Sequence, residues 1–179
     1  YLGAKKTIAR IDNYEYLQPK HKEFFKSLGI NSLIYPEKLA AEEIATSIKY
    51  CWMRQMLEFG NGELVMIGVK VRGNSSIINI PFRDLQRDMP YHIVAIQRGD
   101  ETIIPRGNDI IEVDDLVCFM TTKSHISYIR DICGKEQFSE VKSVVMMGGS
   151  RIAVRTAELI PSDISIKIIE SDYARCNKL

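Results

Sequence analysis

Apolar and polar positions in the first 35 residues follow a strand–helix–strand pattern. Residues 6–11 are β-prone, residues 19–28 carry apolar side chains at helical spacing, and residues 31–35 are β-prone again. Gly29 follows the helical stretch, where a helix often ends on a left-handed residue. The pattern therefore predicts a βαβ unit with two parallel strands.

The longest helical pattern begins at Pro36 and is stopped by Asn61-Gly62. Apolar side chains recur every four residues along it, at Ala40, Ile44, Ile48, Trp52 and Met56. A helix of about 24 residues would be roughly 36 Å long, which is more than a crossover in a small sheet needs. Two interpretations are open: a core helix, or a connector between domains that also carries a dimer seam.

Short strands dominate residues 63–134. They are predicted over residues 64–71, 91–98, 101–105 and 116–120, with a helical turn over 81–85 and a short helix over 123–133. Gly99-Asp100 fits a type II′ hairpin, because glycine takes the positive φ of the first turn position. Asp114-Asp115 predicts a further turn. This texture indicates a compact α+β domain.

Residues 141–179 carry the strongest chemical signal. The predicted order is a buried strand over 143–147, the turn Gly148-Gly149-Ser150, a helix over 151–160 and a strand over 164–169. A dinucleotide-binding fingerprint needs a glycine for the tight turn, a second glycine facing the pyrophosphate, and a small residue where the helix packs on the strand.

This segment matches the fingerprint with one departure. Gly148 and Ala153 fill the first and third positions, whereas Ser150 stands at the second. Glu170 follows Gly148 by 22 residues, at a strand end where an acid can bind ribose hydroxyls. Two interpretations are open: a nucleotide site, or a Rossmann-like unit that keeps its turn and has lost its ligand.

Composition narrows the class of protein. The 179 residues are 45% hydrophobic and 26% charged, with 24 basic and 23 acidic residues and a net charge of +1. These values exclude a disordered chain and argue against nucleic-acid binding through a general electrostatic field. Four scattered cysteines and the lack of a long apolar run indicate a reduced, soluble, cytoplasmic protein.

Other catalytic patterns are missing from the sequence. The cysteines and the three histidines lack metal-ligand spacing, and there is no nucleophile elbow or Walker loop. We therefore expect no catalytic residues and no metal site. Arg98, Arg106 and Asp109 lie around the predicted hairpin and fit either an anion site or a solvated surface.

Four blocks, in this order, resemble the TrkA-type regulators of potassium transport, which are built from RCK (KTN) domains. The blocks are residues 6–11, residues 28–41, residues 63–134 (especially 96–100 and 103–107), and residues 145–153 together with 168–172. The resemblance implies partial Rossmann-like βαβ units flanking a small α+β TrkA-C subdomain, joined by a long helix. The implied domains are residues 1–35 (end of a first Rossmann-like domain), 36–62 (linker and dimerisation helix), 63–135 (TrkA-C ligand-binding subdomain) and 141–179 (start of a second Rossmann-like domain).

The resemblance also implies ligand contacts. It places NAD(H) or an adenine nucleotide (ATP or ADP) at Gly148, Gly149, Ser150, Arg151, Ile152 and Glu170, and it places Arg10 near the nucleotide of the first domain. Ser150 departs from the usual glycine. Asp114 stands where the family commonly has glycine, and Asp tolerates a positive φ.

The implied function is a cytosolic, nucleotide-responsive gating subunit of a potassium uptake system, with no catalysis of its own. Its partners would be a TrkH/TrkG-like membrane subunit and further copies of the chain, with no nucleic acid, at the inner face of the membrane. Two alternatives are an NAD-dependent oxidoreductase and an assembly module with a vestigial nucleotide site.

Overall fold

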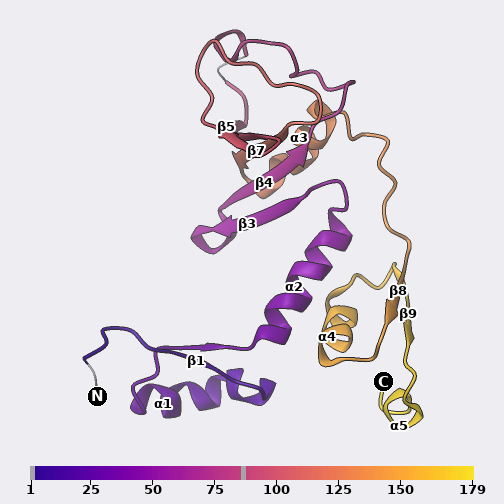
Figure 1. Cartoon of the computed structure of the whole chain (residues 1–179). Coiled ribbons are helices and arrows are strands. Elements are labelled where there is room, and N and C mark those ends of the chain that lie inside the picture. Colours follow the sequence, from indigo (N-terminus) through magenta and orange to yellow (C-terminus); the bar gives the residue numbers. More distant parts are fainter. Residues whose placement is uncertain (1–2, 86–87) are drawn as a thin grey trace. The chain divides into compact units, whose positions relative to one another are not determined.

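A computed structural model describes residues 3–85 and 88–179. The chain divides into two compact units (Figure 1). Residues 1–45 together with 142–179 form one unit, which we call the flanking unit, and residues 46–141 form the other, which we call the sheet unit.

The first half of the flanking unit is a βαβ unit. It consists of β1 (Ile8–Arg10), the 3₁₀ helix η1 (Tyr14–Leu17), α1 (Pro19–Ser27) and β2 (Ser32–Ile34). β1 and β2 pair in parallel. Pro19 lies in the first turn of α1, and Gly29, with a φ of +77°, follows its end. The predicted strand–helix–strand order is confirmed.

The second half of the flanking unit repeats this arrangement. It consists of β8 (Ser143–Met147), α4 (Arg151–Leu159), β9 (Ser165–Ile169) and the short helix α5 (Tyr173–Cys176). β8 and β9 pair in parallel, in register from Ser143 opposite Ser165 to Met147 opposite Ile169. Because the strands run parallel, both reach their carboxyl ends at the same edge of the sheet, beside the turn that starts α4.

The sheet unit holds a five-stranded antiparallel sheet with the strand order β3-β4-β7-β5-β6. Its elements are β3 (Gln55–Phe59), η2 (Gly60–Gly62), β4 (Leu64–Lys70), η3 (Phe82–Asp84), β5 (Tyr91–Arg98), β6 (Glu101–Ile103), β7 (Leu116–Thr121), η4 (Lys123–His125) and α3 (Ile126–Ile132). The core is built from fully buried apolar side chains, among them Ile67, Ile96, Phe119 and Ile129. The predicted α+β composition of this segment is confirmed.

The long helix predicted over residues 36–60 is wrong in its second half. The helix α2 (Pro36–Lys49) ends eleven residues early, and residues 55–59 form the edge strand β3. Trp52 is buried in the core of the sheet unit, as a packing anchor should be. Gln55 pairs with Gly68 on β4. An apolar residue every fourth position also satisfies the period-2 pattern of a strand, so tertiary pairing decides the structure here.

Two predicted turns have the expected backbone. Gly99 has a φ of +58° between β5 and β6, and Asp100 does not share a positive φ, which favours type II′ over type I′. Asp114 has a φ of +70° just before β7, so aspartate does take the left-handed conformation at this position. Within residues 3–85 and 88–179, no helix combines the length and apolar character that crossing a membrane requires.

Candidate functional site

The turn between β8 and α4 is shaped by its first glycine. Gly148 has a φ of +99°, which L side chains rarely adopt, and its N–H donates to the Ile169 carbonyl at 2.7 Å. A Cβ at this position would meet nothing within 4 Å. The backbone angle therefore requires the glycine, and the hydrogen bond ties the turn to the end of β9.

Gly149 lies against the carboxylate that follows β9. Its N–H donates to Glu170 Oε2 at 2.9 Å. A Cβ on Gly149 would lie 3.2 Å from that oxygen and 2.6 Å from Cδ1 of Leu179. Here glycine is required because other atoms approach closely.

Glu170 is held as an ionised carboxylate. Its Oε1 accepts the Asp172 N–H at 2.9 Å, Arg175 Nη1 lies 3.8 Å from Oε2, and the side chain is 6% exposed. The backbone hydrogen bond from Asp172, followed by the one from Gly149, holds the pKa of Glu170 below its usual range. Open α/β sheets bind their ligands at the carboxyl ends of parallel strands, where this negative charge lies.

Ser150 is the N-cap of α4. Its side chain accepts the Ala153 N–H at 3.2 Å, and its backbone is extended. The hydroxyl therefore satisfies one of the free N–H groups of the first helical turn and can still donate its own proton. A glycine at this position would leave that N–H to a ligand.

Arg151 reaches the other half of the flanking unit. Its Nη1 donates to the Asp12 carbonyl at 2.6 Å. Ile152 is half-buried on α4. Arg10 is exposed at the end of β1, two residues before Asp12, and among the described residues no hydrogen bond or ion pair involves its side chain. The structure thus brings Gly148, Gly149, Ser150 and Glu170 together, whereas Arg151 binds the first half, and no hydrogen bond or ion pair among the described residues links the Arg10 side chain to the turn.

A second contact joins the two halves of the flanking unit. The Arg155 guanidinium lies 4.2 Å from the ring centroid of Tyr14, and Arg155 also pairs with Glu158 at 2.7 Å. The hydrogen bond to Glu158 raises the pKa of Arg155. The first half of the chain is therefore attached to the helix that begins at the glycine turn.

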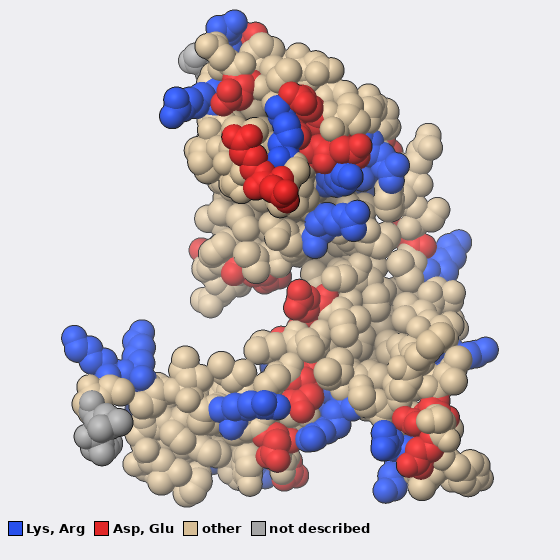
Figure 2. All heavy atoms as spheres, viewed as in Figure 1, with Lys and Arg blue, Asp and Glu red and all other residues tan. Residues whose placement is uncertain are grey.

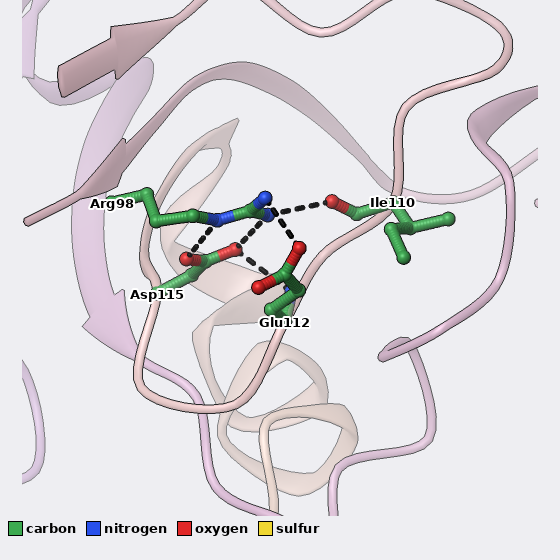
Figure 3. A network of polar contacts seen from close by, with 4 residues as sticks. All are labelled: Arg98, Ile110, Glu112 and Asp115. Atoms are coloured by element: carbon green, nitrogen blue, oxygen red, sulfur yellow. Dashed lines mark hydrogen bonds and ion pairs between the residues drawn. The ribbon is translucent and has the colours of Figure 1, made fainter.

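The sheet unit contains a buried ion-pair network (Figure 3). Arg98 Nε and Nη2 donate to the two carboxylate oxygens of Asp115 at 2.9 and 2.8 Å, and Nη1 donates to Glu112 Oε1 at 2.5 Å. Nη2 also donates to the Ile110 carbonyl at 3.0 Å. Asp115 is 2% exposed and also accepts the Glu112 N–H at 2.8 Å. The hydrogen bonds that Arg98 donates to the Asp115 carboxylate raise the pKa of Arg98.

This network bears on the two interpretations of Arg98, Arg106 and Asp109, which were an anion site and a solvated surface. Arg98 is engaged by carboxylates on both edges, so it is not available as an anion ligand. Asp109 accepts the Arg106 N–H at 2.7 Å, which closes a local turn. Figure 2 shows acidic and basic side chains lying next to each other on this unit. The three residues thus form structural contacts and a mixed surface.

Comparison with known proteins relates most of the sheet unit to a known domain family. Residues 66–134 match the model of the TrkA-C domain. We call this segment the TrkA-C domain after the model that it matches. Over 178 residues the chain is 32% identical to the "Trk system potassium uptake protein TrkA" of Haemophilus influenzae, a match that covers 96% of the chain and 38% of that protein. The chain therefore spans less than two fifths of this relative.

Solved structures share the fold around the TrkA-C domain. The GsuK RCK domain has a TM-score of 0.51 at 15% identity and covers 93% of the chain and 36% of that structure. The GsuK channel bound to NAD has a TM-score of 0.51 at 13% identity and covers 94% of the chain and 32% of that structure. At these identities the likeness concerns the fold alone.

Burial disfavours the thiolate form of both cysteines of the TrkA-C domain. Burial raises the pKa of Cys118, and it raises that of Cys133 to about 12. In the described part of the chain, no three His, Cys, Asp or Glu side chains gather in a way that could hold a metal ion.

Three side-chain contacts could not be identified by sequence analysis. They are the Asp115 partner of Arg98, the Asp12 partner of Arg151 and the Tyr14 partner of Arg155. The sequence contained a signal for the contact between Arg98 and Asp115, because Asp115 lies in the predicted turn before β7. The other two join residues more than 130 positions apart, and no local pattern could have indicated them.

Proposed function

We propose that the chain is part of a cytoplasmic regulatory subunit of a potassium uptake system and has no catalysis of its own. The similarity to TrkA over 96% of the chain supports this proposal. The TrkA-C domain and the RCK-like fold are the parts that such a regulator needs to sense a ligand and to assemble.

The flanking unit would bind a nucleotide at the turn between β8 and α4. The observation that carries this proposal is the Glu170 carboxylate, held 2.9 Å from the Gly149 N–H at the carboxyl ends of two parallel strands. The N-terminus of α4 would face the phosphates, and Glu170 would accept the ribose hydroxyls. The contacting residues would be Gly148, Gly149, Ser150, Arg151, Ile152 and Glu170, with Arg10 near the nucleotide of the first half.

The ligand would be NAD(H) or an adenine nucleotide. A solved relative in fold, the GsuK channel, has NAD bound. An acid at the end of the second strand favours a ribose with a free 2′-hydroxyl. A 2′-phosphate at that position would be repelled by the negative charge of the carboxylate.

Ligand binding would act on the contacts between the two halves. Arg151 follows the glycine turn directly and binds the Asp12 carbonyl, so ligand phosphates would compete for its guanidinium. A ligand shifts an equilibrium only as far as it binds one state better. This conformational change would then be transmitted to a TrkH/TrkG-like membrane potassium subunit. The chain would act as a homo-oligomer that is attached to the inner face of the membrane through that partner.

Isothermal titration of the protein with NADH and with ATP tests this function. Saturable binding of either ligand supports the proposal. Failure of both ligands to bind favours an assembly module with a vestigial site. Oxidation of NADH in the presence of candidate carbonyl substrates, followed at 340 nm, would instead indicate an oxidoreductase.

A further inference from the structure

Lys135 is a buried lysine without an acidic partner. The residue is 5% exposed, and it directly follows the glycine that ends α3. Within residues 3–85 and 88–179, no carboxylate lies within ion-pair distance of its Nζ. Such a charge is normally paired when it leaves water, because burial without a partner is costly.

The ammonium of Lys135 shares one aromatic ring with Arg72. Lys135 Nζ lies 5.1 Å from the Phe138 ring centroid, and the Arg72 guanidinium carbon lies 5.3 Å from the same centroid. The Arg72 N–H also donates to the Cys133 carbonyl at 3.4 Å, which holds this loop against the end of α3. Two cations are thus fixed around one ring by backbone contacts.

Two further cations lie within electrostatic range. Burial, followed by the charges of Arg72, Arg54 and Lys70, lowers the pKa of Lys135. Lys70 pairs with Asp114 at 3.1 Å, which is the only ion pair that these four basic residues make in the described part of the chain. The cluster therefore carries an excess of positive charge that the chain does not neutralise.

The Lys135 ammonium is not completely sealed from solvent. Among the described residues, the fully buried side-chain polar atoms that have no hydrogen-bond partner belong to Glu37, Tyr91 and Thr156. Lys135 Nζ is not one of them, so the ammonium keeps a path to solvent. Arg54 and Arg72 are exposed.

We propose that Arg72 and Lys135, which share the Phe138 ring, form a site for a phosphate group on the TrkA-C domain, separate from the nucleotide site of the flanking unit. Lysine and arginine together suit a phosphate, since the guanidinium supplies two parallel donors and the ammonium a compact charge. The phosphate is either inorganic phosphate or the phosphate of a nucleotide.

Residue-resolved NMR on the full chain tests this site with inorganic phosphate and, separately, AMP as probes, at constant ionic strength set with sodium chloride. We expect saturable shifts of the Arg72, Lys135 and Phe138 amides. Shifts with phosphate alone identify the free anion as the ligand, and tighter binding of AMP identifies a nucleotide. Shifts at Gly149 report on the other site, so the two proposals can fail independently.

Lys135→Met removes the charge and keeps the length of the side chain. We expect it to weaken phosphate binding by about 10-fold or more, whereas Arg106→Met, an exposed cation of the same unit, should change it by less than about 2-fold. Arg72→Met is a second variant at an exposed position, in case Lys135→Met does not fold. Shifts that do not saturate, or equal losses in Arg72→Met and Arg106→Met, would overturn the proposal.

Discussion

The Glu170 carboxylate and the Gly149 N–H, 21 positions apart in sequence, form a 2.9 Å hydrogen bond between the end of β9 and the turn after β8. This bond lies at the edge where both parallel strands end. A ribose in the site would reach the same carboxylate, so the geometry makes Glu170 the most informative position to change.

Glu170→Gln should weaken NADH or ATP binding by about 10-fold or more, because it removes the charged acceptor from the ribose position. Isothermal titration measures the loss. Asp163→Asn is the matched control, since Asp163 is an exposed acid of the same unit. Equal affinities of Glu170→Gln and the parent protein would remove Glu170 from the site.

The folded flanking unit should lose stability in acid through Glu170. Its pKa is lowered on folding, so its contribution is complete above the unfolded pKa of about 4.3 and is lost as the pH falls through the lower folded value. The Gly149 amide shift should therefore titrate with a midpoint below about 4.3. Glu170→Gln should abolish this titration, and a midpoint above that value would contradict the assignment.

Arg98→Met should destabilise the TrkA-C domain by about 3 kcal/mol, because it leaves the Asp115 carboxylate buried without its partner. Arg98 is about a third exposed, which keeps the expected loss at the low end for a buried pair. Urea unfolding measures it. Arg106→Met, which removes an exposed cation, should cost less than about 0.5 kcal/mol. Similar losses in the two variants would show that the network does not stabilise the domain.

Gly68→Ala should destabilise the sheet, because its Cβ would lie 2.7 Å from Gln55 Cγ on β3. Shortening the neighbour in Gly68→Ala/Gln55→Ala should recover most of the loss, as thermal unfolding of both variants can determine. Gln55→Ala alone is the control. The recovery depends on β3 being paired in this register, so additive losses would argue against the strand at residues 55–59.

The apolar stripe of α2 remains the predicted dimer seam. Ile44 is 42% exposed on this helix, and Leu39 is 54% exposed. Ile44→Asp should lower the mass measured by light scattering, because a charge would have to be buried between two copies. Glu43→Gln changes an exposed neighbour and should leave the mass unchanged. A mass unaffected by Ile44→Asp would exclude this part of α2 from the seam.

Much of the fold could be predicted from local patterns. The two βαβ halves followed from short β-prone runs around helical stretches, and Gly29, Gly99 and Asp114 have the backbone angles that their turns require. β3 could not be predicted, because Trp52 and Met56 fit helical and strand periods equally well. Its pairing with β4 is a tertiary interaction that the local sequence does not encode.

The candidate site could likewise be predicted only in part. The turn and its acid could be predicted, because glycine spacing and the position after a strand are local features. The partner of Arg98 depends on a loop that returns to β5, and the partner of Arg151 depends on contact between distant halves. Both depend on packing rather than on any motif.

The contact between Arg151 and Asp12 has a consequence for biosynthesis. The flanking unit is discontinuous, with residues 46–141 inserted between its halves. At about 5–20 residues per second, a ribosome delivers the second half roughly 5–20 s after the first. During that interval the Asp12 carbonyl has no Arg151 guanidinium to bind, because residue 151 has not yet been synthesised. The order of translation therefore makes this contact a late event, formed only after the whole sheet unit has been synthesised.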